Sequence, residues 1–359
     1  MKAAVCYEYN KPLVVEEVDI DPPQKGEVKV RLVATAICHS DIHNIRGERA
    51  GGKLPIVVGH ESAGYIEELG ENVTSVKPGD PVVVSLISSC GRCLYCVSGH
   101  PELCEAQWPL NTETRLHNKQ GQALAVMART GSLAEYVIVD ESQVVKIPKE
   151  MPMDRAALLA CGVITGVGAV VNCAQVKALS SVVVVGVGGV GVNSVQGAAL
   201  SGAYPIIAVD MLENKLETAR VFGATHTVKA DDKDAIKQVQ QLTSGRGANY
   251  VFVTVGSTAA IAQGFAMSAN GGMIVVAGLP PANQTLNLPP IGSWRQRVIT
   301  TSVMGTTRLS IDVPKLVALY QAGHLKLDEL ITGRYPLEQV NEAIESAERG
   351  EALRNVIIF

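Results

Sequence analysis

The sequence predicts an α/β protein with two domains, a β-rich one followed by a doubly wound parallel sheet. The chain has 359 residues, and at roughly 150 residues per domain this length suggests about two domains. Hydrophobic residues make up 47% and aromatic residues only 4%, whereas 34 glycines are present. Many glycines with few aromatic rings suit tight strand-to-helix turns better than an aromatic-cored sandwich.

The first part of the chain, to about residue 145, has the short β-branched runs and turn residues of a β-rich domain. Strands are therefore expected at 28–34, 82–84 and 136–139. Between residues 104 and 131 the sequence is polar and has no clear periodicity. We expect a long, mostly solvated loop there.

After about residue 154 short apolar segments alternate with helical ones, which is typical of a parallel, doubly wound sheet. Asp154 is a plausible N-cap for a helix over 154–160, and a later helix is expected to begin near Pro314. The expected strands are 181–185, 206–209, 226–228, 250–255, 273–277 and 355–359. The other expected helices follow the glycine turn through residue 200 and cover 214–222, 234–242 and 337–349. We place domain boundaries near Cys161 and Met304.

Charge and hydropathy argue against several classes of partner. Lys and Arg total 31 against 35 Asp and Glu, a net charge of −4, so nothing attracts a nucleic acid or an anionic membrane. The most apolar run, residues 182–192, is 11 residues long, whereas a bilayer span needs about 20. The first residues lack the apolar stretch of a secretory signal. We therefore expect a cytoplasmic protein that acts on a small molecule.

A glycine-rich turn follows the apolar strand and opens a helix, in the pattern Gly186-x-Gly188-x-x-Gly191. Such a turn brings backbone N–H groups and a helix N-terminus to a pyrophosphate. A second strand ends in Asp210, whose carboxylate would accept hydrogen bonds from the adenosine ribose and repel a 2′-phosphate. Lys215 would approach the same ribose, and the alternative for the aspartate is a helix cap. The pattern predicts a dinucleotide site that prefers NAD to NADP.

Four cysteines lie within fifteen residues, with spacings of two, two and seven: Cys90, Cys93, Cys96 and Cys104. Four thiolates this close can hold one tetrahedral Zn²⁺. A ferredoxin-type iron–sulfur run needs a shorter last gap followed by proline, whereas here Glu105 follows, and a reducing compartment disfavours disulfides. Because the protein fills all four positions, the sequence predicts a structural zinc site.

The other four cysteines are unremarkable by spacing alone, and core thiols are the alternative for each of them: Cys6, Cys38, Cys161 and Cys173. Cys38 stands out by its setting, Cys38-His39-Ser40-Asp41-Ile42-His43. Gly59-His60-Glu61 adds a second imidazole beside a carboxylate.

Together these motifs resemble the zinc-dependent medium-chain alcohol dehydrogenase family over essentially the whole chain. The residues that carry the resemblance are Cys38–Asp41, Gly59–Glu61, the four-cysteine segment, Cys161–Gly166, Gly186–Gly191 with Asp210, and the tail Ala352–Phe359. The resemblance implies a GroES-like catalytic domain, residues 1–161 and 304–359, with a structural zinc lobe at 90–104. It also implies a Rossmann NAD-binding domain at 162–303.

The same resemblance implies a second, catalytic zinc. Cys38, His60 and Cys161 would ligate it and leave its fourth position open to water or substrate. Glu61 would be a nearby carboxylate, and Asp41 would hold the tautomer of His60. Cys6 and Cys173 match no functional position of the family.

Further roles follow from the resemblance. Ser40 would take the substrate proton and His43 would pass it to solvent, although a turn hydroxyl and a surface imidazole are the alternatives. Thr165 would lie against the nicotinamide and Arg354 would approach the pyrophosphate. His39 replaces an arginine often found at its position, which would weaken the grip on pyrophosphate. The expected cofactor contacts are His39, Thr165, Gly186, Gly188, Gly189, Val190, Gly191, Asp210, Lys215, Val255, Ala277, Leu279 and Arg354.

The substrate pocket is expected to hold Ser40 and two apolar wall residues, Leu86 and Leu279, although either leucine would also suit a core. Trp108 and Met127 would contribute to the pocket entrance. Apolar walls favour a hydrocarbon or aromatic alcohol over a polyol.

The leading hypothesis is a zinc-dependent enzyme that interconverts alcohols and aldehydes or ketones by hydride transfer to or from NAD. Alternatives within the family are a polyol or sugar dehydrogenase and a thiol-dependent formaldehyde dehydrogenase. A catalytically silent NAD- and zinc-binding protein would not need an open metal position, and a zinc-free quinone reductase would not need the ligands. A homodimer or homotetramer is expected because residues 299–304 resemble the edge strand that joins cofactor domains in the family.

Overall fold

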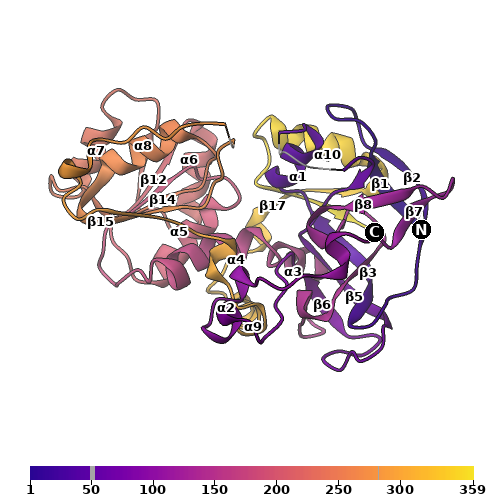
Figure 1. Ribbon diagram of the computed structural model, residues 1–359. Helices are drawn as coiled ribbons and strands as arrows, with labels where there is room; N and C mark the ends of the chain where they lie inside the picture. Colours follow the sequence, from indigo (N-terminus) through magenta and orange to yellow (C-terminus); the bar gives the residue numbers. More distant parts are fainter. Residues whose placement is uncertain (49–52, 282) are drawn as a thin grey trace. The chain divides into compact units, whose positions relative to one another are not determined.

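The computed structural model describes residues 1–48, 53–281 and 283–359 (Figure 1). The chain forms two compact units, one of Met1–Cys161 with Arg308–Phe359 and one of Gly162–Thr307. The second boundary lies four residues beyond the expected position at Met304. In the described part of the chain, no helix has the length and apolar character needed to cross a membrane.

The second unit is built on a six-stranded parallel sheet with the order β13-β12-β11-β14-β15-β16. Its strands are β11 (Val182–Val185), β12 (Ile206–Asp210), β13 (His226–Lys229), β14 (Ala248–Val253), β15 (Ser268–Val276) and β16 (Val298–Thr301). All four valines of β11 are buried, as expected for a strand covered on both faces. Because β12 and β14 flank β11 on opposite sides, the strand order reverses at its carboxyl end, where α/β sheets bind ligands.

Helix α4 (Gly162–Gly168) precedes the sheet, and its strands are connected by α5 (Gly191–Leu200), α6 (Glu213–Val221), α7 (Ala235–Leu242) and α8 (Thr258–Met267). The alternation of strand and helix agrees with the pattern expected from the sequence. Strand β14 ends at Val253, two residues earlier than expected, so Val255 belongs to the loop beyond it. Strand β15 begins at Ser268, five residues earlier than expected.

The first unit is β-rich and contains a seven-stranded sheet and a small closed barrel. The sheet has the order β10-β6-β5-β3-β18-β17, with β9 also paired to β3: β3 (Glu27–Ala36), β5 (Ser62–Leu69), β6 (Pro81–Val84), β9 (Tyr136–Asp140), β10 (Val144–Lys146), β17 (Ile331–Pro336) and β18 (Arg354–Ile358). The barrel strands are β1 (Lys2–Cys6), β2 (Val14–Ile20), β4 (Ile56–Val57), β7 (Leu116–Asn118) and β8 (Ala123–Val126). Thus the C-terminal segment returns to complete the sheet that the N-terminal half begins.

The expectation of a long solvated loop at 104–131 is wrong for its second half. Strands β7 and β8 form an antiparallel hairpin there, and Leu116, Leu124 and Met127 are buried. Arg115 is also buried and pairs with Glu27 through two hydrogen bonds of 3.0 and 2.7 Å. The hairpin is stabilised by burial in the barrel, which the polar local sequence does not reveal.

The α-helices of the first unit, within the described residues, are α1 (His39–Ile45), α2 (Leu94–Val97), α3 (Met153–Leu158), α9 (Leu309–Gln321) and α10 (Val340–Glu348). Two expected helix starts are wrong. Pro152 is the N-cap of α3, while the Asp154 carboxylate pairs with Arg155 and Arg334. Helix α9 begins before Pro314, so the proline lies within it and leaves the carbonyl of Ser310 without the helical N–H donor four residues later.

The close approach of β5 to β3 gives a first prediction. A Cβ at Gly64 would lie 2.1 Å from the carbonyl oxygen of Arg31, so Gly64→Ala should lower the free energy of unfolding by about 2 kcal/mol. Gly292→Ala is the matched control, because nothing lies within 4 Å of a Cβ built there. Urea unfolding measures both variants, and equal midpoints would contradict the close approach.

Candidate functional site

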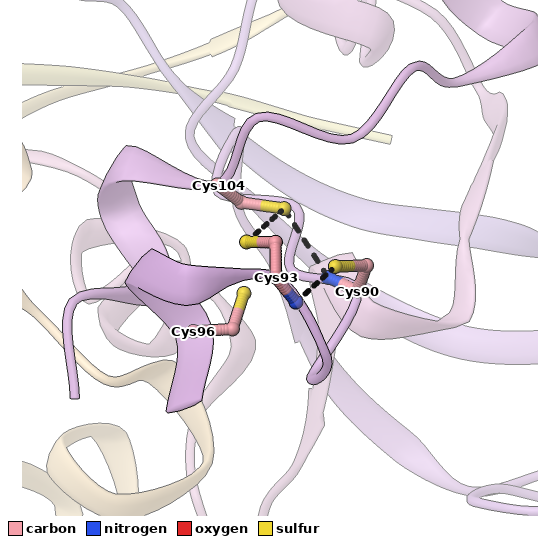
Figure 2. Close-up of side chains that lie close together, drawn as sticks. All are labelled: Cys90, Cys93, Cys96 and Cys104. Carbon is pink, nitrogen blue, oxygen red and sulfur yellow. Dashed lines mark hydrogen bonds between the residues drawn. The ribbon is translucent and has the colours of Figure 1, made fainter. Parts of the chain in front are cut away.

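The four cysteines of the 90–104 segment converge at one point, as Figure 2 shows. Their sulfur atoms lie within 4.8 Å of one another, and those of Cys93 and Cys104 are 3.9 Å apart. The short helix α2 carries Cys96 and begins directly after Cys93. Backbone N–H groups point at the sulfurs, from Cys93 to Cys90 at 3.3 Å and from Cys90 to Cys104 at 3.4 Å.

This arrangement fits Zn²⁺. At a Zn–S distance of about 2.3 Å, tetrahedral sulfur ligands lie about 3.8 Å apart. Hydrogen bonds from the backbone N–H groups of Cys96 and Glu105 lower the pKa of Cys93 to about 6, which favours the thiolate that a metal requires. Since four protein ligands complete a tetrahedron, the cluster has no position left for a substrate.

A second cluster is buried in the first unit and consists of Cys38, His60, Glu61 and Cys161. One ligand atom from each of the four lies within 4.8 Å of the others, and all four side chains are buried. Cys38 is the N-cap residue of α1, the His60–Glu61 pair directly precedes β5, and Cys161 follows α3. The fold therefore brings together the ligand set that the sequence suggested.

Asp41 anchors two of these groups. Its Oδ1 accepts hydrogen bonds from His60 Nδ1 at 2.9 Å and from the Gly59 backbone N–H at 3.0 Å. Its Oδ2 accepts from the backbone N–H of Cys38 at 2.9 Å. Because Nδ1 is engaged, the Nε2 atom of His60 is left to face the cluster, where it is buried and has no hydrogen-bond partner among the described residues.

The charges of the cluster are mutually dependent. A hydrogen bond from Cys161 and the charge of His60 hold the pKa of Cys38 well below its usual range, against the effect of burial. Burial acts to lower the pKa of His60, but the negative charges of Asp41 and Cys38 outweigh it and the pKa is raised well above its ordinary value. The hydrogen bond with Cys38, together with burial, raises the pKa of Cys161.

Glu61 and Arg354 form a buried pair beside the cysteines, with Oε1 and Nη1 3.3 Å apart. Burial raises the pKa of Glu61 to about 8, even though the positive charge of Arg354 opposes this. Neither carboxylate oxygen has a hydrogen-bond partner among the described residues. The pair thus places an acceptor with free lone pairs next to the sulfur ligands.

The second cluster also fits zinc. Two thiol sulfurs, an imidazole nitrogen without a hydrogen-bond partner and a nearby carboxylate are the donor types that Zn²⁺ binds. The bond from His60 to Asp41 is the outer contact that orients zinc-binding histidines in proteins. Cys38, His60 and Cys161 would hold such an ion, and the Glu61 carboxylate lies within reach of the same point.

Helix α1 carries the other polar residues expected near this cluster. His39 is exposed, whereas Ser40 and His43 are half-buried. The Nδ1 atom of His43 hydrogen-bonds the carboxylate of Glu48. Glu48 was not among the predicted site residues. The feature of the sequence that could have indicated it is its position as an acidic residue five places after His43.

The glycine turn of the second unit has the geometry that the sequence predicted. Gly186 has φ of +84°, and helix α5 begins at Gly191. A Cβ at Gly191 would lie 1.9 Å from the carbonyl oxygen of Gly186, so only glycine fits there. Asp210 ends β12 and accepts from the backbone N–H of Val187 at 2.8 Å and of Leu212 at 3.0 Å. The N-cap of α6 is Leu212, so Asp210 is not the helix cap.

The remaining predicted cofactor residues of the second unit lie on its helices and loops. Lys215 is buried on α6, and Thr165 is buried on α4 with its Oγ1 3.8 Å from the sulfur of Met304. Val255 and Leu279 are exposed in the loops after β14 and β15. Gly188, Gly189, Val190 and Ala277 are half-buried.

Comparisons with known proteins agree with this geometry. Residues 24–149 match the family model of the alcohol dehydrogenase GroES-like domain, and residues 189–322 match that of the zinc-binding dehydrogenases. The NDMA-dependent alcohol dehydrogenase of Amycolatopsis methanolica is 38% identical, over 99% of this chain and 98% of its own length. The S-(hydroxymethyl)glutathione dehydrogenase of Saccharomyces cerevisiae is 35% identical, over 99% and 95%. The crystal structure of benzyl alcohol dehydrogenase from Acinetobacter calcoaceticus, 31% identical, matches with a TM-score of 0.92 over 100% of this chain and 99% of that chain.

The chain therefore belongs to the zinc-dependent medium-chain alcohol dehydrogenase family. It is an enzyme of zinc-dependent alcohol oxidoreduction, and its four-cysteine cluster is a structural zinc site. It has the GroES-like and Rossmann-like domains of that family.

Metal analysis tests both clusters. The purified protein should contain two zinc ions per chain, and Cys161→Ser and Cys104→Ser should each reduce the content to one. Loss of Cys104 should also lower thermal stability, because the lobe has no other cross-link. Cys173→Ser is the control and should keep both ions. A wild-type content of one zinc or none would contradict the assignment of two sites.

Proposed function

We propose that this enzyme oxidises primary alcohols with apolar side chains and reduces the matching aldehydes, with NAD as the hydride carrier. The observation that carries the proposal is the buried set of Cys38, His60 and Cys161, with the bare Nε2 atom of His60 aimed into it. The second unit carries a glycine turn of the dinucleotide-binding type before α5, and the neighbouring strand β12 ends in the acidic residue Asp210. One site therefore suits a Lewis acid, and the other suits a hydride acceptor.

A zinc ion held by these three residues would supply Lewis-acid polarisation of the alcohol oxygen and make its proton more acidic. The protein's own residues do the remaining work. Asp41 fixes the orientation of His60 and the backbone at Cys38. Glu61 and Arg354 form an ion pair next to these residues. Both side chains are buried, so the pair is shielded from water.

The proton leaves through helix α1. Ser40 lies two residues after Cys38, and His43 lies one turn further along the same helix, so the two side chains share a face. The bond from His43 Nδ1 to the Glu48 carboxylate favours the tautomer that carries its proton on Nδ1. The Nε2 atom is then the basic one and can accept the proton that Ser40 takes from the alcohol.

Asp210 supports NAD rather than NADP. Its carboxylate is fixed by two backbone N–H groups directly beside the glycine turn. A negative charge there accepts hydrogen bonds from a ribose diol and repels a 2′-phosphate.

The proposed preference for alcohols with apolar side chains depends on Leu86, which would form an apolar wall of the substrate pocket. Leu86 is half-buried, and its neighbour Ser85 donates to the carbonyl of Ala160, the residue before Cys161, at 2.7 Å. This bond supports a position of Leu86 close to the metal ligands. A hydroxymethyl adduct of a thiol is a second candidate substrate, favoured by the yeast relative named S-(hydroxymethyl)glutathione dehydrogenase.

We also infer a homo-oligomer joined through the second unit. Strand β16 is the edge of the six-stranded sheet and pairs only with β15 among the described strands. Val298 on this strand is exposed, and its free edge can pair with the same strand of another copy.

A spectrophotometric screen tests the proposed reaction. Benzyl alcohol and ethanol should reduce NAD, with little turnover of NADP or of sorbitol. Separate arms supply formaldehyde with glutathione, and NDMA without free NAD because a relative is named for that compound. Turnover confined to polyols, or preference for NADP, would refute the proposed substrate or cofactor.

The proton path is tested at its first member. Ser40→Ala should lower kcat by about 10²-fold or more, because one positioned proton-transfer group contributes roughly that factor. Zinc content and the melting temperature should stay unchanged, since Ser40 is not a ligand. Ser40→Thr keeps the hydroxyl and is the matched control. Normal turnover of Ser40→Ala would exclude the relay.

A further inference from the structure

Arg129 holds two separate segments of the first unit with all three nitrogens of its guanidinium. Its Nε donates to Ser88 Oγ at 3.1 Å and its Nη2 to the carbonyl of Leu86 at 3.1 Å. Its Nη1 donates to Asn111 Oδ1 at 3.0 Å. One side chain thus joins the proposed pocket wall to the segment that follows the zinc lobe.

The backbone that carries this side chain is strained. Ala128 and Arg129 have φ angles of +53° and +60°, in the left-handed region. This conformation is unfavourable for a residue with a Cβ, whereas glycine adopts it freely. Strain of this kind persists only where surrounding contacts maintain it, and it tends to occur at functional sites.

The segment that carries Arg129 and the segment at Leu86 are each fixed next to the buried metal cluster. The hydroxyl of Thr130, the next residue, donates to the carbonyl of Gly59 at 2.9 Å, one residue before the metal-site histidine. On the other side, Ser85 donates to Ala160, one residue before the metal-site cysteine. A shift of Arg129 would therefore move the wall relative to the metal ligands.

The contacts of Arg129 are directional hydrogen bonds to uncharged groups. In the described ranges no carboxylate lies within ion-pair distance of its guanidinium. Burial lowers the pKa of Arg129, while the charges of Asp140 and Cys104 act the other way. The planar guanidinium of Arg129, called its fork below, has five N–H donors in fixed directions and matches these three acceptors. The single ammonium group of a lysine cannot do this.

We propose that Arg129 is a positioning residue that fixes the pocket wall at Leu86 and thereby sets the preference of the enzyme for bulky alcohols. The inference rests on the proposed function, because Leu86 lines the substrate pocket only under that proposal. Nothing in the family resemblance assigned a role to Arg129.

Two substitutions distinguish the effect of the Arg129 side chain from the effect of its backbone conformation. Arg129→Gly removes the fork and relieves the left-handed strain, and Arg129→Lys keeps a charge without the fork. In both, kcat/KM for benzyl alcohol should fall by about tenfold and that for ethanol by less than about twofold, because only the larger substrate uses the wall. Both zinc ions should remain. Hydrogen–deuterium exchange should rise in segments 85–89 and 108–112.

Arg115→Lys is the matched control. Arg115 is also buried and uses its fork, but on Glu27 rather than on the wall. This variant should lose stability and keep the benzyl alcohol to ethanol ratio of the wild type.

An unchanged ratio in Arg129→Gly with both zinc ions present would overturn the inference and leave the proposed function intact. So would unchanged exchange in segments 85–89 and 108–112. If the wild type oxidises neither alcohol, the proposed function has failed. In that case the exchange measurement alone decides whether Arg129 positions the segment at Leu86.

Discussion

The metal site depends on the hydrogen bonds that the buried carboxylate of Asp41 accepts. The carboxylate accepts three hydrogen bonds, two from backbone N–H groups and one from the ring of His60. These bonds connect the start of helix α1 to the turn before β5. Cys38 and His60 are therefore held in position by bonds to backbone N–H groups as well as by the bond to the His60 ring. Because the carboxylate of Asp41 bonds the Nδ1 atom of His60, the ring presents Nε2 to the cluster.

Charge balance explains why so many polar groups are buried together around that carboxylate. Cys38, His60, Glu61 and Arg354 would each be costly to bury alone, but they lie within reach of one another and of Cys161. Removing water from such a cluster strengthens every interaction within it. The same dry surroundings would let a zinc ion held there polarise an alcohol oxygen more strongly than it could in water.

Backbone geometry has the equivalent role in the Rossmann-like unit. The contact between Gly186 and Gly191 leaves no space for a Cβ, so the first turn of α5 lies directly against the end of β11. The N–H of Val187 in that turn donates to Asp210, which joins the glycine turn to the acidic end of β12. In the GroES-like unit Arg129 joins loops in a similar way, but through a side chain and a strained backbone.

The sequence by itself determined what depends on neighbours along the chain. The four-cysteine cluster and the strand–glycine–helix turn were evident because local turns alone bring their groups together. The convergence of Cys38, His60 and Cys161 followed from family resemblance, because nothing in their spacing relates a helix N-cap, a strand start and a helix end. Only the tertiary structure decided the β7–β8 hairpin and the hydrogen-bond partners of Arg129. Burial of Leu116 and Leu124 comes from the barrel around them, and a hydrogen bond between distant segments depends on how the sheets place each side chain.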